Sequence, residues 1–353
     1  MQRYSAERLR EIGQAIFIAA GAPKDEAAIV MRHLIEASLA GHDSHGIRSL
    51  ISYVERIKKK HIVPGAKWEV VQETPTSTVV DGHWGFGYVV TENVTRMTID
   101  KARKIGVAAA TVRHQSHIGR LGGYTTMMAE AGMIGLITAD SGRGPKAVVP
   151  FGGAEPRLGT NPISIAVPSN LEGPFFLDMA TSAVAAGKIS VALARGESIP
   201  EGWIIDAEGN QTTDPKKFRG SGWLLPLGGS EGHKGYALAA MVEVLCGLLT
   251  GLGFGVSPTG IHNDGCFLAV FNVEAFRPLA DFKQEVTEFA RYLKDTKPAK
   301  GSKGVFYPGE MEHLSAIERR RDGIGVEPKT WNGLADLASE YGIAGKLGME
   351  KTA

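Results

Sequence analysis

The segment VAAATVRHQSHIGRLGGYTTMMAEAGMIGLIT, residues 107–138, holds two short apolar runs on either side of a helical pattern. Residues 107–112 and 134–138 have the length and composition of buried strands, and residues 124–131 predict a helix between them. A strand–helix–strand order is typical of layered α/β domains, in which helices cover the faces of a sheet. This segment therefore predicts an α/β fold.

The same alternation extends on both sides of the segment. Further strands are predicted at residues 68–72, 77–81, 163–167, 175–178 and 266–273, and further helices at 94–105, 182–195 and 236–249. Residues 141–162 contain five glycines and four prolines, so they form a long connection without a periodic pattern. A connection of that length in a compact domain is more often functional than idle.

Both ends of the chain have helical patterns. Ser5 can cap the first of three amphipathic helices, and the third of them follows Ser44. Three more helices are predicted at residues 274–294, 311–321 and 331–341. We expect the two ends to pack together as one helical domain, residues 1–75 with 280–353, beside an α/β domain of residues 76–279.

The charges of the chain are balanced. Its 353 residues include 39 basic and 38 acidic side chains, for a net charge of +1. No overall field is present to attract nucleic acid or an anionic membrane surface, so neither partner is expected. The most apolar stretch, residues 236–252, carries Glu243 and two glycines, which favours a core helix over a membrane span.

The cysteines and histidines do not form a metal-binding pattern. Cys246 and Cys266 lie in no CxxC motif and cannot build a disulfide framework, which fits a reducing cytoplasm. His42 and His45 lack a third ligand at metal spacing, and no HExxH motif occurs. No metal site is predicted.

A polar segment, GHDSHGIR at residues 41–48, separates two of the N-terminal helices. Reduction of a 2-oxo acid leaves an alkoxide that must receive a proton, and imidazole titrates near neutrality. A planar guanidinium suits the substrate carboxylate. His45, Ser44 and Arg48 therefore fit a site for this reaction. In the alternative interpretation the segment is a helix–helix turn, in which Ser44 or Asp43 caps the next helix.

A second polar segment, RHQSHIG at residues 113–119, follows the predicted strand at 107–112. Open α/β sheets usually bind ligands beyond the carboxyl ends of their strands. His117 is therefore a second candidate for the acid/base. The alternative is that Ser116 caps a helix and that the histidine is merely exposed.

Three glycine-containing turns precede or join regular elements, at residues 158–162, 178–182 and 231–236. Helix N-termini with free N–H groups, small residues and a lysine are natural pyrophosphate sites, although many such turns bind nothing. Asn161 is the cofactor-binding candidate of the first turn. A GxGxxG motif after a strand and a P-loop are both absent from the sequence, so no Rossmann fingerprint supports dinucleotide binding.

Seven motifs resemble those of the malate/L-lactate dehydrogenase family of the second, non-Rossmann type, which includes sulfolactate and ureidoglycolate dehydrogenases and diketogulonate reductase. They occur in the order of the family and span roughly residues 5 to 345. The motifs are GHDSHG with Arg48, SHIG around His117, VVPFGG at 148–153, GTNP at 159–162, LDMATS at 177–182, HKGYALA at 233–239 and YPGE at 307–310.

The resemblance implies a NAD(P)-binding α/β domain with a mixed sheet, a helical domain built from both chain termini, and a homodimer. It also implies that His45 or His117 is the acid/base, with Ser44 and Arg48 around the substrate. Cofactor contacts are implied for Ser141, Asp178, Met179, Ala180, Thr181, Ser182, Lys234, Gly235, Pro308, Gly309 and Glu310. The sequence offers no rule for choosing between NAD and NADP.

The predicted function is NAD(P)-dependent interconversion of a small 2-oxo acid and its 2-hydroxy acid, in which a histidine transfers the proton. The alternatives are a cyclic imine reductase of the piperideine-2-carboxylate type, a metal-dependent hydrolase and an inactive binding protein. The loop at residues 142–146 is longer and more basic than in relatives, so the substrate stays open. Three cations could bind a second carboxylate or a sulfonate of the substrate, namely Arg120, Arg143 and Lys146. In the alternative interpretation they are solvated cations of loops.

Overall fold

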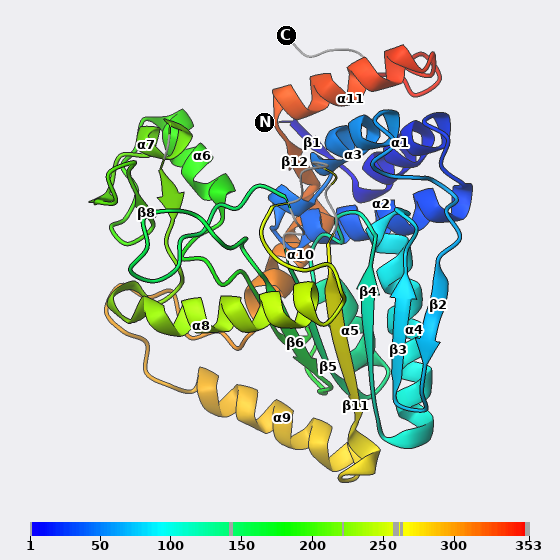
Figure 1. The fold of residues 1–353 in the computed structure, drawn as a ribbon, viewed down its shortest axis with the longest axis vertical. Helices are drawn as coiled ribbons and strands as arrows, with labels where there is room; N and C mark the ends of the chain where they lie inside the picture. Colours follow the sequence, from blue (N-terminus) through cyan, green and yellow to red (C-terminus); the bar gives the residue numbers. More distant parts are fainter. Residues whose placement is uncertain (1, 141–143, 221, 257–260, 262–263, 350–353) are drawn as a thin grey trace.

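The centre of the molecule is a seven-stranded mixed sheet (Figure 1). The computed structural model describes residues 2–140, 144–220, 222–256, 261 and 264–349. The strand order is β2 (Glu69–Glu73), β3 (Ser77–Asp81), β4 (Val107–Arg113), β11 (Cys266–Asn272), β5 (Met133–Ala139), β6 (Ile163–Val167) and β7 (Phe175–Met179). Within this sheet β3 and β4 are parallel and the other neighbours are antiparallel. The predicted α/β fold with a mixed, non-Rossmann sheet is confirmed.

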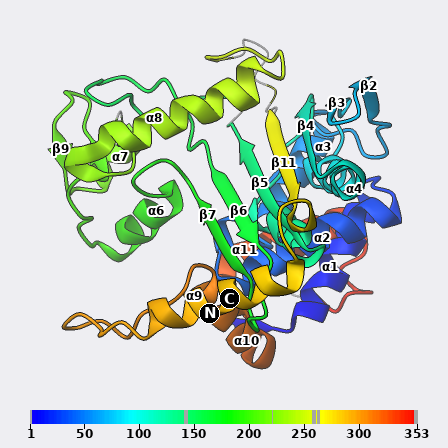
Figure 2. The same ribbon diagram turned by 90° about the horizontal axis from the view of Figure 1, so that it is seen from below.

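Helices cover both faces of the sheet, and successive residues of a strand point to these faces in alternation. On one face, α5 (Gly122–Glu130) packs closely on β5, because Gly135 leaves room for the Met128 side chain. Thr138, three residues along, points to the opposite face and lies 3.0 Å from the Cys246 sulfur. Cys246 belongs to a π-helical turn, Val244–Leu248, that continues α8 (Gly232–Glu243). Helix α4 (Gly87–Ile105) packs on β4 and β11, and Figure 2 shows these elements from below.

The two ends of the chain meet beside the sheet. Strand β1 (Gln2–Tyr4) pairs with β12 (Ile324–Val326), and the ring of Tyr4 stacks on that of Trp331 with centroids 4.1 Å apart. The helical layer seen at one end of the sheet in Figure 1 contains α1 (Ala6–Ala19), α2 (Lys24–Leu39), α3 (Ser49–Lys58) and α11 (Pro328–Glu340), and α10 (Glu310–Asp322) packs on α2.

The predicted domain boundaries stay a prediction. Strand β2 precedes the expected boundary at residue 75, yet it forms the edge of the sheet. One continuous core also joins the two parts, since Leu34 of α2, Val94 of α4 and Leu334 of α11 belong to the same buried cluster.

A small third unit, which the sequence analysis missed, follows the sheet. It contains α6 (Ala186–Arg195), β8 (Ile204–Ile205), β9 (Gln211–Thr212), α7 (Lys216–Gly220) and β10 (Trp223–Leu224). The connection at 141–162 supports this unit in its described part, because Val148 bridges to Leu158 and Leu224 and shares a buried cluster with them. Strands of two residues carry no periodic signal, so the sequence could not predict them.

Helix α8 differs from the expected core helix. Its buried side includes Ala239 and Val242, but Met241 is 56% exposed and Leu249, just beyond the π-helical turn, is 58% exposed. The remaining elements are the single turns Gly229–Glu231 and Val273–Ala275 and the helix α9 (Leu279–Lys294). No described helix combines the length and the apolar character needed to cross a membrane.

Candidate active site

The segment between α2 and α3 forms a short 3-10 turn, Asp43–His45. The alternative interpretation, in which Ser44 or Asp43 caps the next helix, is wrong: α3 begins only at Ser49 without a side-chain cap, and the Ser44 hydroxyl lies 3.0 Å from Nδ1 of His45. The turn is fixed to α2, because the backbone N–H of Ile47 donates to the Ser38 hydroxyl at 3.0 Å. Ser44 and His45 therefore form a local pair on a fixed loop.

The loop after β4 carries His117 and is fixed from two sides. The Ser116 hydroxyl accepts from the backbone N–H of Gly87, the first residue of α4, at 3.1 Å. The N–H of Ile118 donates to Asp264 at 3.0 Å. Ser116 therefore binds the N-terminus of α4 and does not cap a helix that follows it in the sequence. His117 is partly buried rather than merely exposed.

These two loops bring the predicted histidines together. The rings of His45 and His117 are stacked, with centroids 5.6 Å apart and planes 18° apart. The hydroxyl of Tyr53, on α3, lies 2.6 Å from Nδ1 of His117. Tyr53 lies outside the motifs singled out above, so sequence reasoning did not select it.

The surroundings of His45 favour its neutral form. Burial, followed by the positive charges of His42 and Arg120, lowers the pKa of His45 from 6.5 to about 4, against the opposing effect of Asp264. Burial also raises the pKa of the Tyr53 hydroxyl to about 12. At neutral pH the site therefore contains an uncharged His45 and a protonated Tyr53.

Arg48 precedes α3 directly and is exposed. Within the described parts of the chain, its guanidinium makes no hydrogen bond or ion pair. It is therefore able to take a carboxylate ligand without first giving up a protein partner.

Asp178 lies at the end of β7, where a buried ion pair forms. Its carboxylate accepts from the N–H of Gly122 at 2.8 Å and lies 3.4 Å from Nε of Arg120. Burial raises the pKa of Asp178, while the charge of Arg120 opposes the rise. Arg120 is therefore a paired, largely buried residue, and the interpretation of it as a solvated loop cation is wrong.

The predicted turn at 178–182 packs against the turn at 158–162. The Thr181 hydroxyl donates to the carbonyl oxygens of Thr160 and Asn161, both at 3.0 Å. The amide of Asn161 donates to Ala239 at 3.0 Å and to Glu243 at 2.9 Å. Asn161 is fully buried, so its side chain holds the turn against α8.

Glu243 also pairs with Lys146, at 3.1 Å, and both side chains are buried. Lys146 is therefore not a solvated loop cation either. Arg143 and the predicted cofactor residue Ser141 lie outside the described residues.

The other predicted cofactor residues of the LDMATS motif lie at the end of β7 and directly after it. Met179 is the last residue of that strand, Ala180 comes next, and the Ser182 hydroxyl donates to the carbonyl of Val184 at 3.0 Å.

Lys234 and Gly235 lie in the first turn of α8. The Lys234 side chain is exposed and pairs with Glu231 at 3.2 Å. A Cβ on Gly235 would come within 2.1 Å of the Leu227 carbonyl, so this position requires glycine for packing alone. The N–H of Leu227 donates to the carbonyl of Thr181 at 2.9 Å, which places this turn beside the one at 178–182.

Pro308, Gly309 and Glu310 pack on the other side of β7. The Pro308 carbonyl accepts from the N–H of Phe176 at 3.1 Å. Gly309 has a φ of +95°, and a Cβ there would lie 2.4 Å from a backbone oxygen. Glu310 is buried, pairs with Lys294 and accepts from the N–H of Tyr307. The sheet edge at β7 thus brings together predicted residues from two distant motifs.

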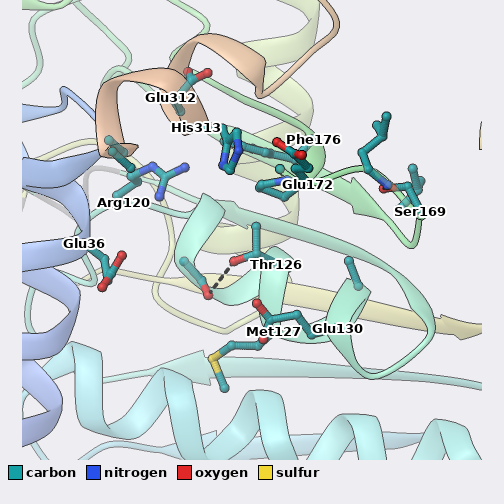
Figure 3. Close-up of a pocket in the computed structure, with 18 of the residues that line it drawn as sticks. Glu36, Arg120, Thr126, Met127, Glu130, Ser169, Glu172, Phe176, Glu312 and His313 are labelled. Atoms are coloured by element: carbon teal, nitrogen blue, oxygen red, sulfur yellow. Dashed lines mark hydrogen bonds between the residues drawn. The ribbon is translucent and has the colours of Figure 1, made fainter. Parts of the chain in front are cut away.

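A cavity of about 490 Å³ opens next to this edge (Figure 3). Its walls come from α2, α5, α10 and the β6–β7 turn, and the guanidinium of Arg120 extends into it near Glu312 and His313 of α10. His45 and His117 do not line the cavity. Arg120 connects the cavity electrostatically to His45, because its charge acts on both His45 and Asp178.

Three observations at this edge fit a dinucleotide. The N-terminus of α5 begins with Gly122 and Gly123; the preceding residue, Leu121, supplies no capping side chain, and Asp178 accepts from the N–H of Gly122 alone. A Cβ on Gly122 would come within 2.8 Å of both Arg120 and Asp178, so a larger residue would disrupt their pairing. The buried Nε of Arg120 makes no hydrogen bond with any described residue. Glycine-lined helix N-termini beside a cation are suited to pyrophosphate.

Among the described residues, no group of three or more His, Cys, Asp and Glu side chains has the arrangement of a metal site.

Comparison with known proteins reveals similarity over almost the whole chain. The sequence model of malate/L-lactate dehydrogenase matches residues 4–335. A malate dehydrogenase of Pyrococcus abyssi is 38% identical over 333 residues, covering 92% of this chain and 91% of the relative. Hydroxycarboxylate dehydrogenase B of Escherichia coli (strain K12) is 36% identical over 351 residues, covering 97% of this chain and 95% of the relative.

Solved structures show the same similarity. The crystal structure of malate dehydrogenase from Entamoeba histolytica has a TM-score of 0.92 at 32% identity, with 96% of this chain and 98% of that chain covered. The Δ1-piperideine-2-carboxylate reductase of Pseudomonas syringae has a TM-score of 0.84 at 29% identity, with 96% and 100% covered.

Proposed function

The chain belongs to the malate/L-lactate dehydrogenase family, and from this premise we propose that it interconverts a small 2-oxo acid and its 2-hydroxy acid with His117 as the proton donor and acceptor. That the enzyme is a 2-hydroxy acid dehydrogenase working with a nicotinamide cofactor follows from the family. The observation that supports the site most strongly is the stacking of His45 and His117, at 5.6 Å, from two separate loops.

The surroundings of His45 argue against it as the acid/base and leave His117 for that role. A group that exchanges a proton at neutral pH works best when its pKa is close to that pH. The pKa of His45 is lowered to about 4, which suits a neutral hydrogen-bonding partner of the substrate oxygen better than a proton source. Ser44, hydrogen-bonded to His45, would orient that ring.

Arg48 is the proposed anchor of the substrate carboxylate, because its guanidinium is exposed beside the histidine loop and has no partner among the described residues. Lys146 and Arg120 are paired with Glu243 and Asp178. Recognition of a second negative charge on the substrate by either cation would first require separating a buried ion pair, which is costly.

The cofactor, NAD or NADP, supplies the hydride when bound. We propose that Gly123, at the N-terminus of α5, meets its pyrophosphate, and that the turn at 178–182 and Glu310 lie along it. The cavity beside Arg120 has the size of a small-molecule site and would take the end of the cofactor remote from the histidines.

The test is a screen of NADH and NADPH oxidation over 2-oxo acids of different charge and bulk. His117→Ala is expected to lower kcat about 10²–10⁴-fold with little change in cofactor affinity, because it removes the proton donor. His45→Ala is expected to lower kcat less. Near-normal turnover by His117→Ala on every acid that the parent reduces would contradict the assignment.

A second candidate reaction is reduction of a cyclic imine, which needs the same carboxylate anchor. The similarity to a Δ1-piperideine-2-carboxylate reductase over 96% of the chain supports its inclusion. Adding this imine to the screen distinguishes the two: faster turnover of the imine than of every 2-oxo acid would favour the imine reductase.

We also propose that the enzyme is a homodimer. Helix α10 exposes an apolar stripe of Met311, Leu314 and Ile317, at helical spacing along one face. Large apolar stripes on a surface helix usually mark a contact with another chain.

A further inference from the structure

Behind His117 lies a chain of two buried hydroxyl groups. The Tyr53 hydroxyl is 2.6 Å from Nδ1 of His117 and 3.1 Å from the Tyr88 hydroxyl. Tyr53 comes from α3 and Tyr88 from α4, and both side chains are only 2% exposed. Two helices from different parts of the fold therefore place their hydroxyl groups in line with one nitrogen of the imidazole.

We propose that Tyr53, supported by Tyr88, is a positioning residue that sets the orientation and the tautomer of His117. This inference rests on the proposed function, in which His117 exchanges the proton with the substrate. Because Tyr53 holds Nδ1, a proton exchanged with the substrate has to pass through Nε2, on the opposite side of the ring.

The position of each proton during the reaction explains why a hydroxyl group suits the place next to Nδ1. During oxidation of the hydroxy acid, neutral His117 must present a lone pair at Nε2, so its own proton must be on Nδ1. Tyr53 accepts that N–H while its own O–H turns to Tyr88. After His117 has taken the substrate proton, Nδ1 still carries its hydrogen, and the same hydrogen bond persists. In the reverse direction Nε2 returns the proton, and Nδ1 again stays protonated.

Tyr53 stays neutral throughout this cycle. Burial raises the pKa of its hydroxyl to about 12, so it does not lose its proton to the imidazole. A buried carboxylate in the same place would bind the imidazolium strongly and hinder return of the proton. A phenol fixes the geometry without adding this charge.

The backbone next to His117 leaves room for the two tyrosine hydroxyls. Gly119 has a φ of +73°, and a Cβ there would come within 2.1 Å of the Tyr88 hydroxyl. The Tyr124 hydroxyl donates to the carbonyl of Ile118 at 2.7 Å and so supports the same loop without touching His117. Tyr124 therefore provides a matched control: a third buried tyrosine, next to the loop but outside the chain of hydroxyls.

The experiment is a double-mutant cycle on the full chain, with the cofactor and the best substrate from the screen. Tyr53→Phe is expected to lower kcat about 10- to 100-fold, because a misplaced reacting group costs this much, with KM and the Kd for the cofactor changed less than about twofold. In the His117→Ala background, Tyr53→Phe should lower kcat no further, because the residue through which it acts is gone. An equal fold-loss in both backgrounds, or no loss in the parent, would overturn the inference.

Two further variants separate positioning from general support of the loop. Tyr124→Phe is expected to lower Tm about as much as Tyr53→Phe while kcat stays within about twofold of the parent. A kcat loss in Tyr124→Phe equal to that in Tyr53→Phe would also overturn the inference. If Tyr53→Phe does not fold, Tyr88→Phe takes its place in the cycle. Tyr88→Phe is expected to lower kcat by a smaller factor in the parent and not at all in the His117→Ala background.

The outcomes distinguish this inference from the proposed function. Full turnover by His117→Ala would contradict the proposed function itself. Loss of turnover in His117→Ala together with full turnover in Tyr53→Phe would contradict only the positioning role.

Discussion

His45 is surrounded by groups that disfavour its charged form. Its pKa is lowered to about 4 by burial and by the charges of His42 and Arg120. Between pH 6.5 and about 4 the unfolded chain therefore binds a proton at this position more readily than the folded chain. The stability that neutral His45 contributes is complete above pH 6.5 and is lost as the pH falls toward 4.

Replacing His45 should remove this part of the pH dependence. We expect the free energy of unfolding of the parent to fall between pH 7.5 and 4.5 by on the order of 2 kcal/mol more than that of His45→Gln. Urea unfolding at the two pH values measures both differences. An equal fall in parent and variant would show that His45 is not held neutral by the fold.

At the scale of single residues, sequence reasoning found the groups that lie in motifs. His45, Ser44 and His117 were selected because their loops carry recognisable polar segments, and the structure places them close together. Tyr53 could not be found in this way, because its role depends on a contact between α3 and a loop 64 positions away. No local pattern encodes such a distance.

At the scale of elements, α2 and α4 are joined by the buried carboxylate of Glu92. It lies 2.7 Å from Arg32 and 2.8 Å from His33, both on α2, and 3.0 Å from Arg96 on its own helix. Burial alone would raise the pKa of Glu92, but the hydrogen bonds from His33, Arg32 and Arg96 outweigh it and lower the pKa to about 2. The carboxylate stays charged and holds the helical layer against the sheet.

Removing this charge should destabilise the protein strongly. Glu92→Gln is expected to lower the free energy of unfolding by about 3 kcal/mol, because His33 and Arg32 lose a buried partner. The control is Asp100→Asn on the same helix, whose side chain is 67% exposed and pairs with Arg103 of α4 and with no other residue that the structure describes. Its expected change is below about 0.5 kcal/mol. Equal effects of the two substitutions in chemical denaturation would contradict the bridging role.

Element prediction succeeded where periodicity was strong. The strand expected at 163–167 has those bounds in the structure, and the helix expected at 311–321 is α10 to within one residue at each end, although α4 begins at Gly87, seven residues before the expected start. Two kinds of element were missed. The strands β1, β8, β9, β10 and β12 are too short to show alternation. The exposed side of α8 was missed because a helical pattern does not reveal what covers the helix.

At the scale of the whole molecule, the exposed apolar stripe on α10 should be the contact between two copies. Sedimentation velocity at micromolar concentration is expected to give the mass of two chains, and Leu314→Glu is expected to shift the equilibrium toward one chain, because it places a charge in the contact. The matched control is Glu318→Gln, on the same helix. A parent of single-chain mass would contradict the proposed homodimer.

The alternation of strands and helices predicted the class of the whole fold, but not how its parts join. The pairing of β1 with β12 links residues more than 300 positions apart, and the insertion of β11 between β4 and β5 links the two halves of the chain. Such pairings depend on registers that form only in the folded chain.

The proposed function places the nicotinamide ring and the two histidines at the same small carboxylate. A crystal structure with NADH and a non-reactive 2-oxo acid analogue tests it directly. We predict the nicotinamide ring and the analogue's carbonyl oxygen beside His45 and His117, with the carboxylate on Arg48. A fully occupied cofactor whose nicotinamide lies away from both histidines would contradict the account.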